Sequence, residues 1–252
     1  MAIREKLPLI ATLQLLASNF AANAIPLNGY NTGVLSDLYP TGFTPPGWVF
    51  AIWLVIYIGL IAYSLAAWRS APRVRARATT VTDLYVINAL ANSAWIFAWH
   101  YRMVLLSVVI MLVIWVTLVA IFVRLRKLSR PTWNEYLRID APFSLYFGWI
   151  TAATLVNFGA LCFDRGMWPF ALAMDEWALV TVCLATGIYA VTTTVTRDAV
   201  FGGVFVWAAC GIALKNQGIS MPVQLAAATG VAVVFACILR AAFVRNDRRR
   251  YF

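Results

Sequence analysis

The chain contains eight long stretches that carry almost no charge, and these stretches restrict the fold more than any other feature. They cover approximately residues 7–27, 46–68, 82–101, 103–123, 141–163, 177–196, 199–214 and 221–243. A helix needs roughly 20 apolar residues to cross a hydrocarbon core of about 30 Å, whereas strands of a membrane barrel alternate polar and apolar residues. The sequence therefore predicts an all-α integral membrane protein with about eight transmembrane helices.

The composition agrees, since 62% of the residues are hydrophobic and only 12% are charged, a balance that a soluble surface does not tolerate. Seventeen of the 20 Lys and Arg residues fall on one set of alternate links between the stretches, and only Arg102, Arg165 and Lys215 fall on the other. The positive-inside rule then places both termini in the cytoplasm and the link 28–45 outside. We expect a bacterial cytoplasmic membrane, contact with membrane lipids and no binding of nucleic acid.

The chain divides by composition into two predicted parts. Residues 1–163 hold five stretches and most of the Trp, and residues 164–252 hold three stretches rich in Ala, Val and Thr, followed by a basic tail. In the last stretch Ala228, Ala232 and Ala236 form a ridge of small residues that would let another helix approach closely. Residues 1–24 also have the pattern of a signal peptide, but we expect them to remain as the first helix.

Two of the stretches place aromatic and amide side chains at helical spacing. Phe50, Trp53 and Tyr57 follow the prolines Pro45 and Pro46 and share one face. The third stretch carries a polar and aromatic stripe formed by Asn88, Asn92, Trp95 and Trp99. Amides in lipid need partners, so this stripe should face the bundle interior, either bonding to neighbouring helices or lining a cavity.

The fifth stretch repeats this signal, with Thr151, Thr154 and Asn157 spaced three apart. We expect Asn157 to face the same interior space as Asn92 and Trp95. An internal site with polar anchors and aromatic walls suits a large, flat and mostly apolar ligand.

Together these passages resemble the TspO/MBR family of translocator and tryptophan-rich sensory proteins. The matching residues are Pro45, Pro46, Trp48, Phe50, Trp53, Tyr57, Asn92, Trp95, Trp115 and the run WITAATLVNF from Trp149. The resemblance covers about residues 1–163 and implies a five-helix bundle that binds tetrapyrroles such as porphyrins. Leu145 replaces a proline of the family, and Phe158 stands where its sterol-recognition pattern would need Tyr, so sterol binding is not implied.

The predicted ligand-binding residues are Trp48, Phe50, Trp53, Tyr57, Asn92, Trp95, Trp99, Trp149, Thr154 and Asn157. We expect a sensory receptor with no covalent cofactor, whose ligand is a tetrapyrrole, a carotenoid or a lipid. The alternatives are an accessory subunit of a larger, pigment-containing membrane complex, a homo-oligomer, and a passive transporter of hydrophobic ligands.

Catalysis and metal binding are not expected, and no catalytic residue or metal ligand is assigned. The sequence has no nucleophile with a nearby base and no cluster of metal-binding residues. His100, the one histidine, could serve as an axial ligand to a haem or chlorophyll metal, but its place beside Tyr101 and Arg102 favours a residue at the membrane interface.

Overall fold

All the predicted apolar stretches are helices in the computed structural model, which describes residues 3–25, 27–30, 32–168 and 171–247. The long helices are α1 (Ile3–Ala24), α3 (Ile52–Arg69), α5 (Thr82–His100), α6 (Val104–Arg126), α8 (Ala141–Arg165), α9 (Met174–Thr196), α10 (Ala199–Lys215) and α11 (Met221–Asp247). Short elements lie between them: η1 (Leu27–Gly29), α2 (Thr32–Asp37), η2 (Gly47–Ala51), α4 (Pro72–Thr79), α7 (Trp133–Glu135) and the π-helix η3 (Tyr136–Asp140). No strand occurs among the described residues, so the all-α prediction is confirmed at this level.

Five of the helical segments are both long and apolar enough to cross a membrane. They are Gly47–Arg69, Val104–Arg126, Trp133–Arg165, Met174–Thr196 and Met221–Phe243. The helix α10 is apolar but shorter, and α1 and α5 carry buried polar side chains such as Thr12, Asn19 and Asn92. Length and composition therefore support five of the eight predicted spans. The spans predicted at α1, α5 and α10 are not established by these two criteria.

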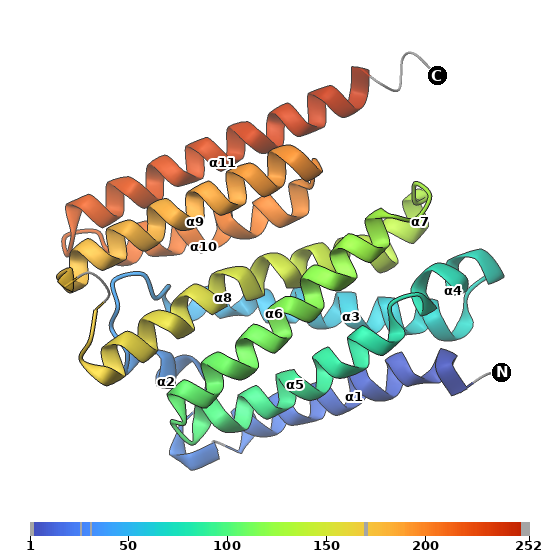
Figure 1. Cartoon of the computed structure of the whole chain (residues 1–252), viewed down its shortest axis with the longest axis horizontal. Helices are drawn as coiled ribbons and strands as arrows, with labels where there is room; N and C mark the ends of the chain where they lie inside the picture. The colour runs from blue at the N-terminus through green and yellow to red at the C-terminus, as the bar shows by residue number, and fades with distance from the viewer. Residues whose placement is uncertain (1–2, 26, 31, 169–170, 248–252) are drawn as a thin grey trace. The chain divides into compact units, whose positions relative to one another are not determined.

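The chain forms two compact units. The N-terminal unit comprises Met1–Leu35 and Ala51–Ile150, and the C-terminal unit comprises Ser36–Phe50 and Thr151–Phe252. In the N-terminal unit α1 packs against α3 and α5, α5 packs against α6, and α4 packs against α3. In the C-terminal unit α9, α10 and α11 pack against one another (Figure 1).

Two links that the sequence left without structure are helical. Pro72 stands at the start of α4, where its missing N–H is not needed. Thr132 and Glu135 form a capping box, in which the Glu135 carboxylate accepts from the Thr132 backbone N–H at 2.7 Å and the Thr132 hydroxyl accepts from the Glu135 N–H at 3.3 Å. The helix that follows this cap begins eight residues before the predicted stretch 141–163. It continues through that stretch, and Trp133–Arg165 is therefore one helical segment.

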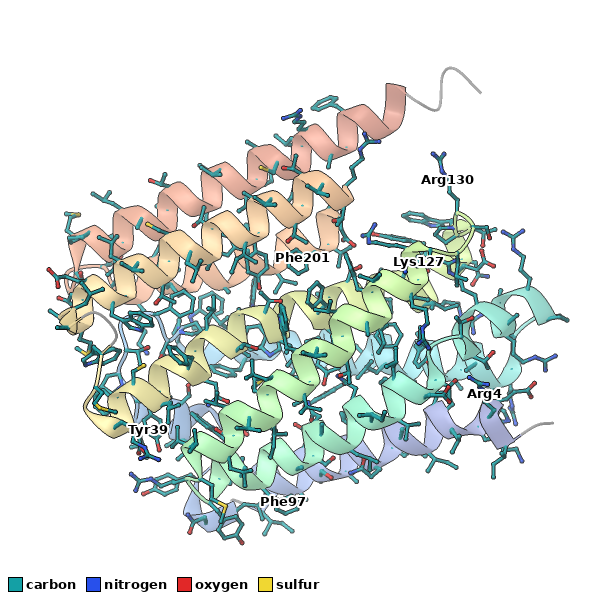
Figure 2. All side chains as sticks on the ribbon, viewed as in Figure 1. Arg4, Tyr39, Phe97, Lys127, Arg130 and Phe201 are labelled. Atoms are coloured by element: carbon teal, nitrogen blue, oxygen red, sulfur yellow. The ribbon has the colours of Figure 1, made fainter. Side chains whose placement is uncertain are left out.

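A tight reversal joins α9 to α10 in the C-terminal unit. Arg197 adopts a left-handed conformation with φ of 54°, and the Asp198 carboxylate caps α10 by accepting from the backbone N–H groups of Val200 and Phe201 at 3.0 Å each. Phe201, labelled in Figure 2, is buried and stacks on Tyr189 of α9 with the ring centroids 4.7 Å apart.

The packing face of α11 differs from the ridge that the sequence suggested. Val223, Ala227 and Val234 are buried, and a Cβ added to Gly230 would lie 2.5 Å from the Thr186 hydroxyl of α9. Ala228, Ala232 and Ala236 are exposed on the other face. Within the C-terminal unit the ridge is therefore not a helix contact.

Candidate functional site

The amide of Asn92 joins three helices inside the N-terminal unit. Asn92 is fully buried on α5. Its Oδ1 accepts from Asn19 Nδ2 of α1 at 2.9 Å, and its Nδ2 donates to the hydroxyl of Tyr146 on α8, also at 2.9 Å. Both polar ends of the side chain are thus used by the protein.

Tyr146 in turn contacts a group of aromatic rings. Its ring centroid lies 5.8 Å from that of Trp53 in an edge contact. Trp53 stacks on Tyr57 at 5.5 Å, and its edge meets Trp149 at 6.3 Å. We call Asn19, Asn92, Tyr146, Trp53, Tyr57 and Trp149 the aromatic–amide cluster; it unites four of the predicted site residues.

Burial divides the aromatic–amide cluster into a base and a face. Tyr146 and Trp149 are buried, whereas Trp53 and Tyr57 on α3 are only half-buried. A flat ligand can reach a ring only where the ring is exposed, so Trp53 and Tyr57 are the members that could stack on one.

Trp95 and Trp99 follow Asn92 along the same stripe of α5. They are buried and stack on one another, with centroids 5.7 Å apart and an interplanar angle of 12°. Asn88, one turn before Asn92, donates to Ile114 O at 3.1 Å and to the Thr117 hydroxyl at 2.8 Å. The Asn88 end of the stripe therefore bonds α5 to α6.

A second polar group of α1, the hydroxyl of Thr12, lies about two helical turns before Asn19. The Thr12 hydroxyl lies 2.6 Å from those of Ser64 on α3 and Tyr85 on α5. Neither Thr12 nor Asn19 was predicted, although their separation of seven residues places both on one face of a helix. Hydroxyl and amide groups at that spacing were the signal that could have found them.

The remaining predicted site residues lie in the C-terminal unit. Trp48 is 47% exposed and meets Trp207 of α10 edge to face at 5.0 Å. Phe50 is half-buried at the end of η2. On α8, Thr154 is half-buried and Asn157 is buried. The expectation that Asn157 shares a space with Asn92 stays a prediction.

His100, expected at the membrane interface, is the last residue of α5. Its side chain is buried, with Nδ1 2.8 Å from Ile96 O and Nε2 3.5 Å from the Thr32 hydroxyl. Asn28 donates to the His100 carbonyl at 3.0 Å. His100 therefore ties the end of α5 to the segment that follows α1, and the described residues contain no group of three His, Cys, Asp or Glu that could hold a metal.

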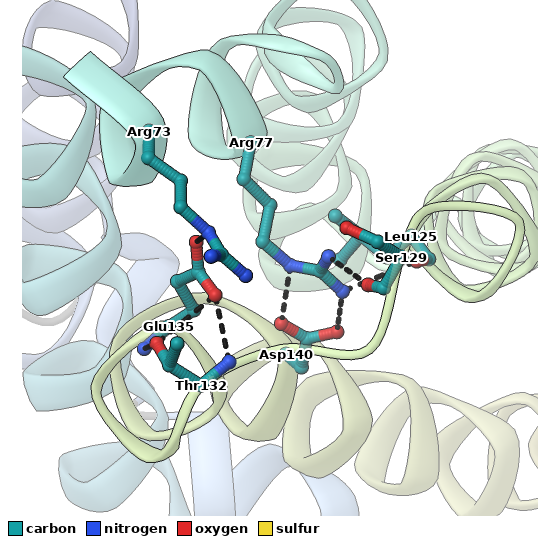
Figure 3. Close-up of polar contacts among 7 residues, drawn as sticks. All are labelled: Arg73, Arg77, Leu125, Ser129, Thr132, Glu135 and Asp140. Atoms are coloured by element: carbon teal, nitrogen blue, oxygen red, sulfur yellow. Dashed lines mark hydrogen bonds and ion pairs between the residues drawn. The ribbon is translucent and has the colours of Figure 1, made fainter.

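An ion-pair network joins α4 to α7 and η3 in the N-terminal unit (Figure 3). Arg77 of α4 is buried and donates to both carboxylate oxygens of Asp140, at 2.9 and 2.6 Å. It also donates to the carbonyls of Ser129 and Leu125 after and within α6. Arg73 pairs with Glu135 at 3.0 Å. Each carboxylate in this network has an arginine partner, which indicates a structural brace.

A bundle of apolar helices whose buried amides and hydroxyls bond from helix to helix defines a polytopic helical membrane protein. The family described as TSPO-like protein matches residues 6–240 of the 252-residue chain. The chain belongs to this TSPO-like family. Comparison with curated proteins and comparison with solved structures gave no match.

The family match confirms the resemblance and extends it. It continues past residue 163, where the resemblance in the sequence ended, and includes α9, α10 and most of α11. The division of the chain into a five-helix domain and an added segment stays a prediction.

Proposed function

We propose that the protein is a membrane receptor that binds a tetrapyrrole, or a similarly flat hydrophobic molecule, at the aromatic–amide cluster and reports its presence to a partner. The observation that carries the proposal is the cluster itself. Half-buried Trp53 and Tyr57 offer ring faces, and they are backed by buried Tyr146 and Trp149. Stacking on such rings is the interaction that a large flat ring system needs.

The hydrogen bonds support different roles for the members of the cluster. Asn92 already accepts from Asn19 and donates to Tyr146. It therefore fixes the position of Tyr146, and Trp53 and Tyr57 supply the contact with the ligand. Trp48, Phe50, Trp95, Trp99, Thr154 and Asn157 stay predicted members of the site.

The same proposal includes eight spans with both termini in the cytoplasm. In the N-terminal unit, Arg4 pairs with Asp83 at the start of α5 at 2.8 Å, and Glu5 pairs with Arg75 at 3.4 Å, so the N-terminal segment and the link between α3 and α5, both assigned to the inside, lie together. In the C-terminal unit, Lys215 lies 3.3 Å from Asp37, which brings together two links assigned to the outside. These three ion pairs support the alternation that an even number of spans requires.

The test compares two tryptophans of α3. Protoporphyrin is titrated into detergent-solubilised protein and its absorption shift is recorded for the wild type, Trp53→Leu and Trp68→Leu. Trp68 lies near the other end of α3, beneath Arg69, whose guanidinium is 3.9 Å from the ring centroid. Loss of stacking at Trp53 should cost about 1.5 kcal/mol, roughly a tenfold rise in Kd, and Trp68→Leu should bind as the wild type does. Equal Kd values in all three proteins would reject the cluster as the site.

A second function, accessory subunit of a larger membrane complex, is favoured by the exposed ridge Ala228, Ala232 and Ala236 on α11. Small residues let a foreign helix approach closely in lipid. Purification in a mild detergent distinguishes the two functions. A partner that copurifies in stoichiometric amount with the wild type, and that Ala232→Leu releases, would favour the accessory subunit over the free receptor.

A further inference from the structure

The segment of residues 36–50, which leads into α3, is fastened to α10 in the C-terminal unit. Trp207 of α10 donates its indole N–H to the backbone carbonyl of Val49 at 2.9 Å. The same indole meets the ring of Trp48 edge to face at 5.0 Å. One side chain thus holds both the backbone and a side chain of η2.

A second attachment is made by Asn216, the residue that caps the C-terminal end of α10. Asn216 is 3% exposed, and its Nδ2 donates to the Gly42 carbonyl at 3.0 Å as well as to Ile212 O at 2.9 Å. Gly42 has a φ of 67°, and a Cβ added there would lie 2.9 Å from Ala178 Cβ on α9. The tip of the 36–50 segment therefore lies against the helices with no room for a side chain.

The middle of α10 is shaped for the same contact. A Cβ added to Gly211 would overlap with Val49 Cγ2 and would lie 3.2 Å from Pro46 Cδ. On the same helix a Cβ added to Gly203 would have no neighbouring atom within 4 Å. Gly211 thus permits the close approach of the segment, and Gly203 has no such role.

The segment also contacts α8. Tyr39 meets Phe163 edge to face at 6.2 Å, and a Cβ on Gly159 would lie 3.4 Å from Thr41 Cγ2. Contacts with α8, α9 and α10 together make the 36–50 segment a part of the C-terminal unit.

Chain connectivity gives this attachment a consequence for α3. The helix Gly47–Arg69 is continuous, and Val49 precedes Trp53 by four residues, about one helical turn. We propose that Trp207 and Asn216 are positioning residues, which hold the 36–50 segment and thereby fix the first turn of the helix that carries Trp53 and Tyr57. The link to ligand binding rests on the proposed function, whereas the attachment itself does not.

The test uses the full chain in lipid nanodiscs and two matched pairs of variants. Gly211→Ala forces the segment away from α10, and Gly203→Ala adds the same methyl group to the same helix in open space. Trp207→Phe removes the indole donor but keeps a ring, and Trp133→Phe makes the same change at an exposed tryptophan of α7. Hydrogen exchange of peptides covering 36–50 is measured without ligand, and the dissociation rate of protoporphyrin is measured separately.

Gly211→Ala and Trp207→Phe should speed hydrogen exchange in 36–50 several-fold and raise the porphyrin dissociation rate several-fold, while peptides of α6 exchange as in the wild type. The control variants should change neither. Unchanged exchange in 36–50 would overturn the attachment, whether or not porphyrin binds. Faster exchange with an unchanged dissociation rate would overturn the positioning role. If the wild type binds no porphyrin, the proposed function fails and the exchange measurement still decides the attachment.

Discussion

The side chain of Asn92 joins α1, α5 and α8 of the N-terminal unit through two hydrogen bonds, each 2.9 Å long. Its spacing with Asn88, Trp95 and Trp99 indicated a buried stripe, and it is fully buried. The sequence left two roles for the stripe, bonding between helices and contact with a ligand. The hydrogen bonds with Asn19 and Tyr146 favour the first role for Asn92.

The residue-scale prediction concerns the bond between Asn92 and Tyr146. Hydrogen bonds between helices in membranes contribute about 0.6–2 kcal/mol, so Asn92→Leu and Tyr146→Phe should each lower the free energy of unfolding. Because the two changes remove the same bond, their effects should be less than additive in a double-mutant cycle. Unfolding in mixed micelles provides the measurement, and fully additive effects would show that the bond contributes no stability.

At the scale of elements, the helix positions follow from hydropathy, but the short helices do not. Long apolar runs have one stable backbone form in lipid, which is why the helical segment Gly47–Arg69, α6 and α9 begin and end within a few residues of their predicted positions. The helices α4 and α7 are polar and owe their ends to local caps at Pro72 and Thr132. Such caps leave a signal in the sequence, but hydropathy alone does not detect it.

The partners of the predicted residues could not be read from the sequence in the same way. Tyr146 and Asn19 join Asn92 from helices 54 and 73 residues away along the chain. Periodicity tells which face of a helix is polar, but not which neighbour that face meets. For the same reason the contact between α10 and residues 36–50, which Trp207 and Asn216 make, had no signal in either segment alone.

The element-scale prediction concerns the brace that Arg77 makes between α4, η3 and the end of α6. Arg77→Leu would leave the carboxylate of Asp140 without its partner, and breaking a buried ion pair in this way costs about 3–5 kcal/mol. Arg130, which follows α6 and is exposed (Figure 2), provides the control, since Arg130→Leu should change stability little. Thermal unfolding in detergent measures both, and equal midpoints for the two variants would show that the network is not a brace.

At the scale of the whole molecule, the distribution of charge indicates that α10 crosses the membrane, whereas the length of α10 argues against it. The division of 17 basic residues against three requires that α10 cross the membrane. Its 17 residues extend about 26 Å at 1.5 Å per residue, slightly less than a hydrocarbon core of about 30 Å. Local thinning of the bilayer can accommodate such a difference at modest cost, and the contacts of Lys215 and Asn216 place the end of α10 beside the 36–50 segment.

We therefore predict that α10 spans the membrane and that its two ends lie on opposite sides. Single cysteines replace Arg197 and Gln217, both exposed and at either end of α10, in a chain whose four native cysteines are changed to Ala. Leu38→Cys and Arg130→Cys are the references for the outside and the inside. A membrane-impermeant maleimide should label positions 38 and 217 in intact cells, and positions 130 and 197 only after the membrane is opened. Labelling of 197 and 217 from the same side would make α10 a re-entrant helix, place the C-terminus outside and remove the even number of spans.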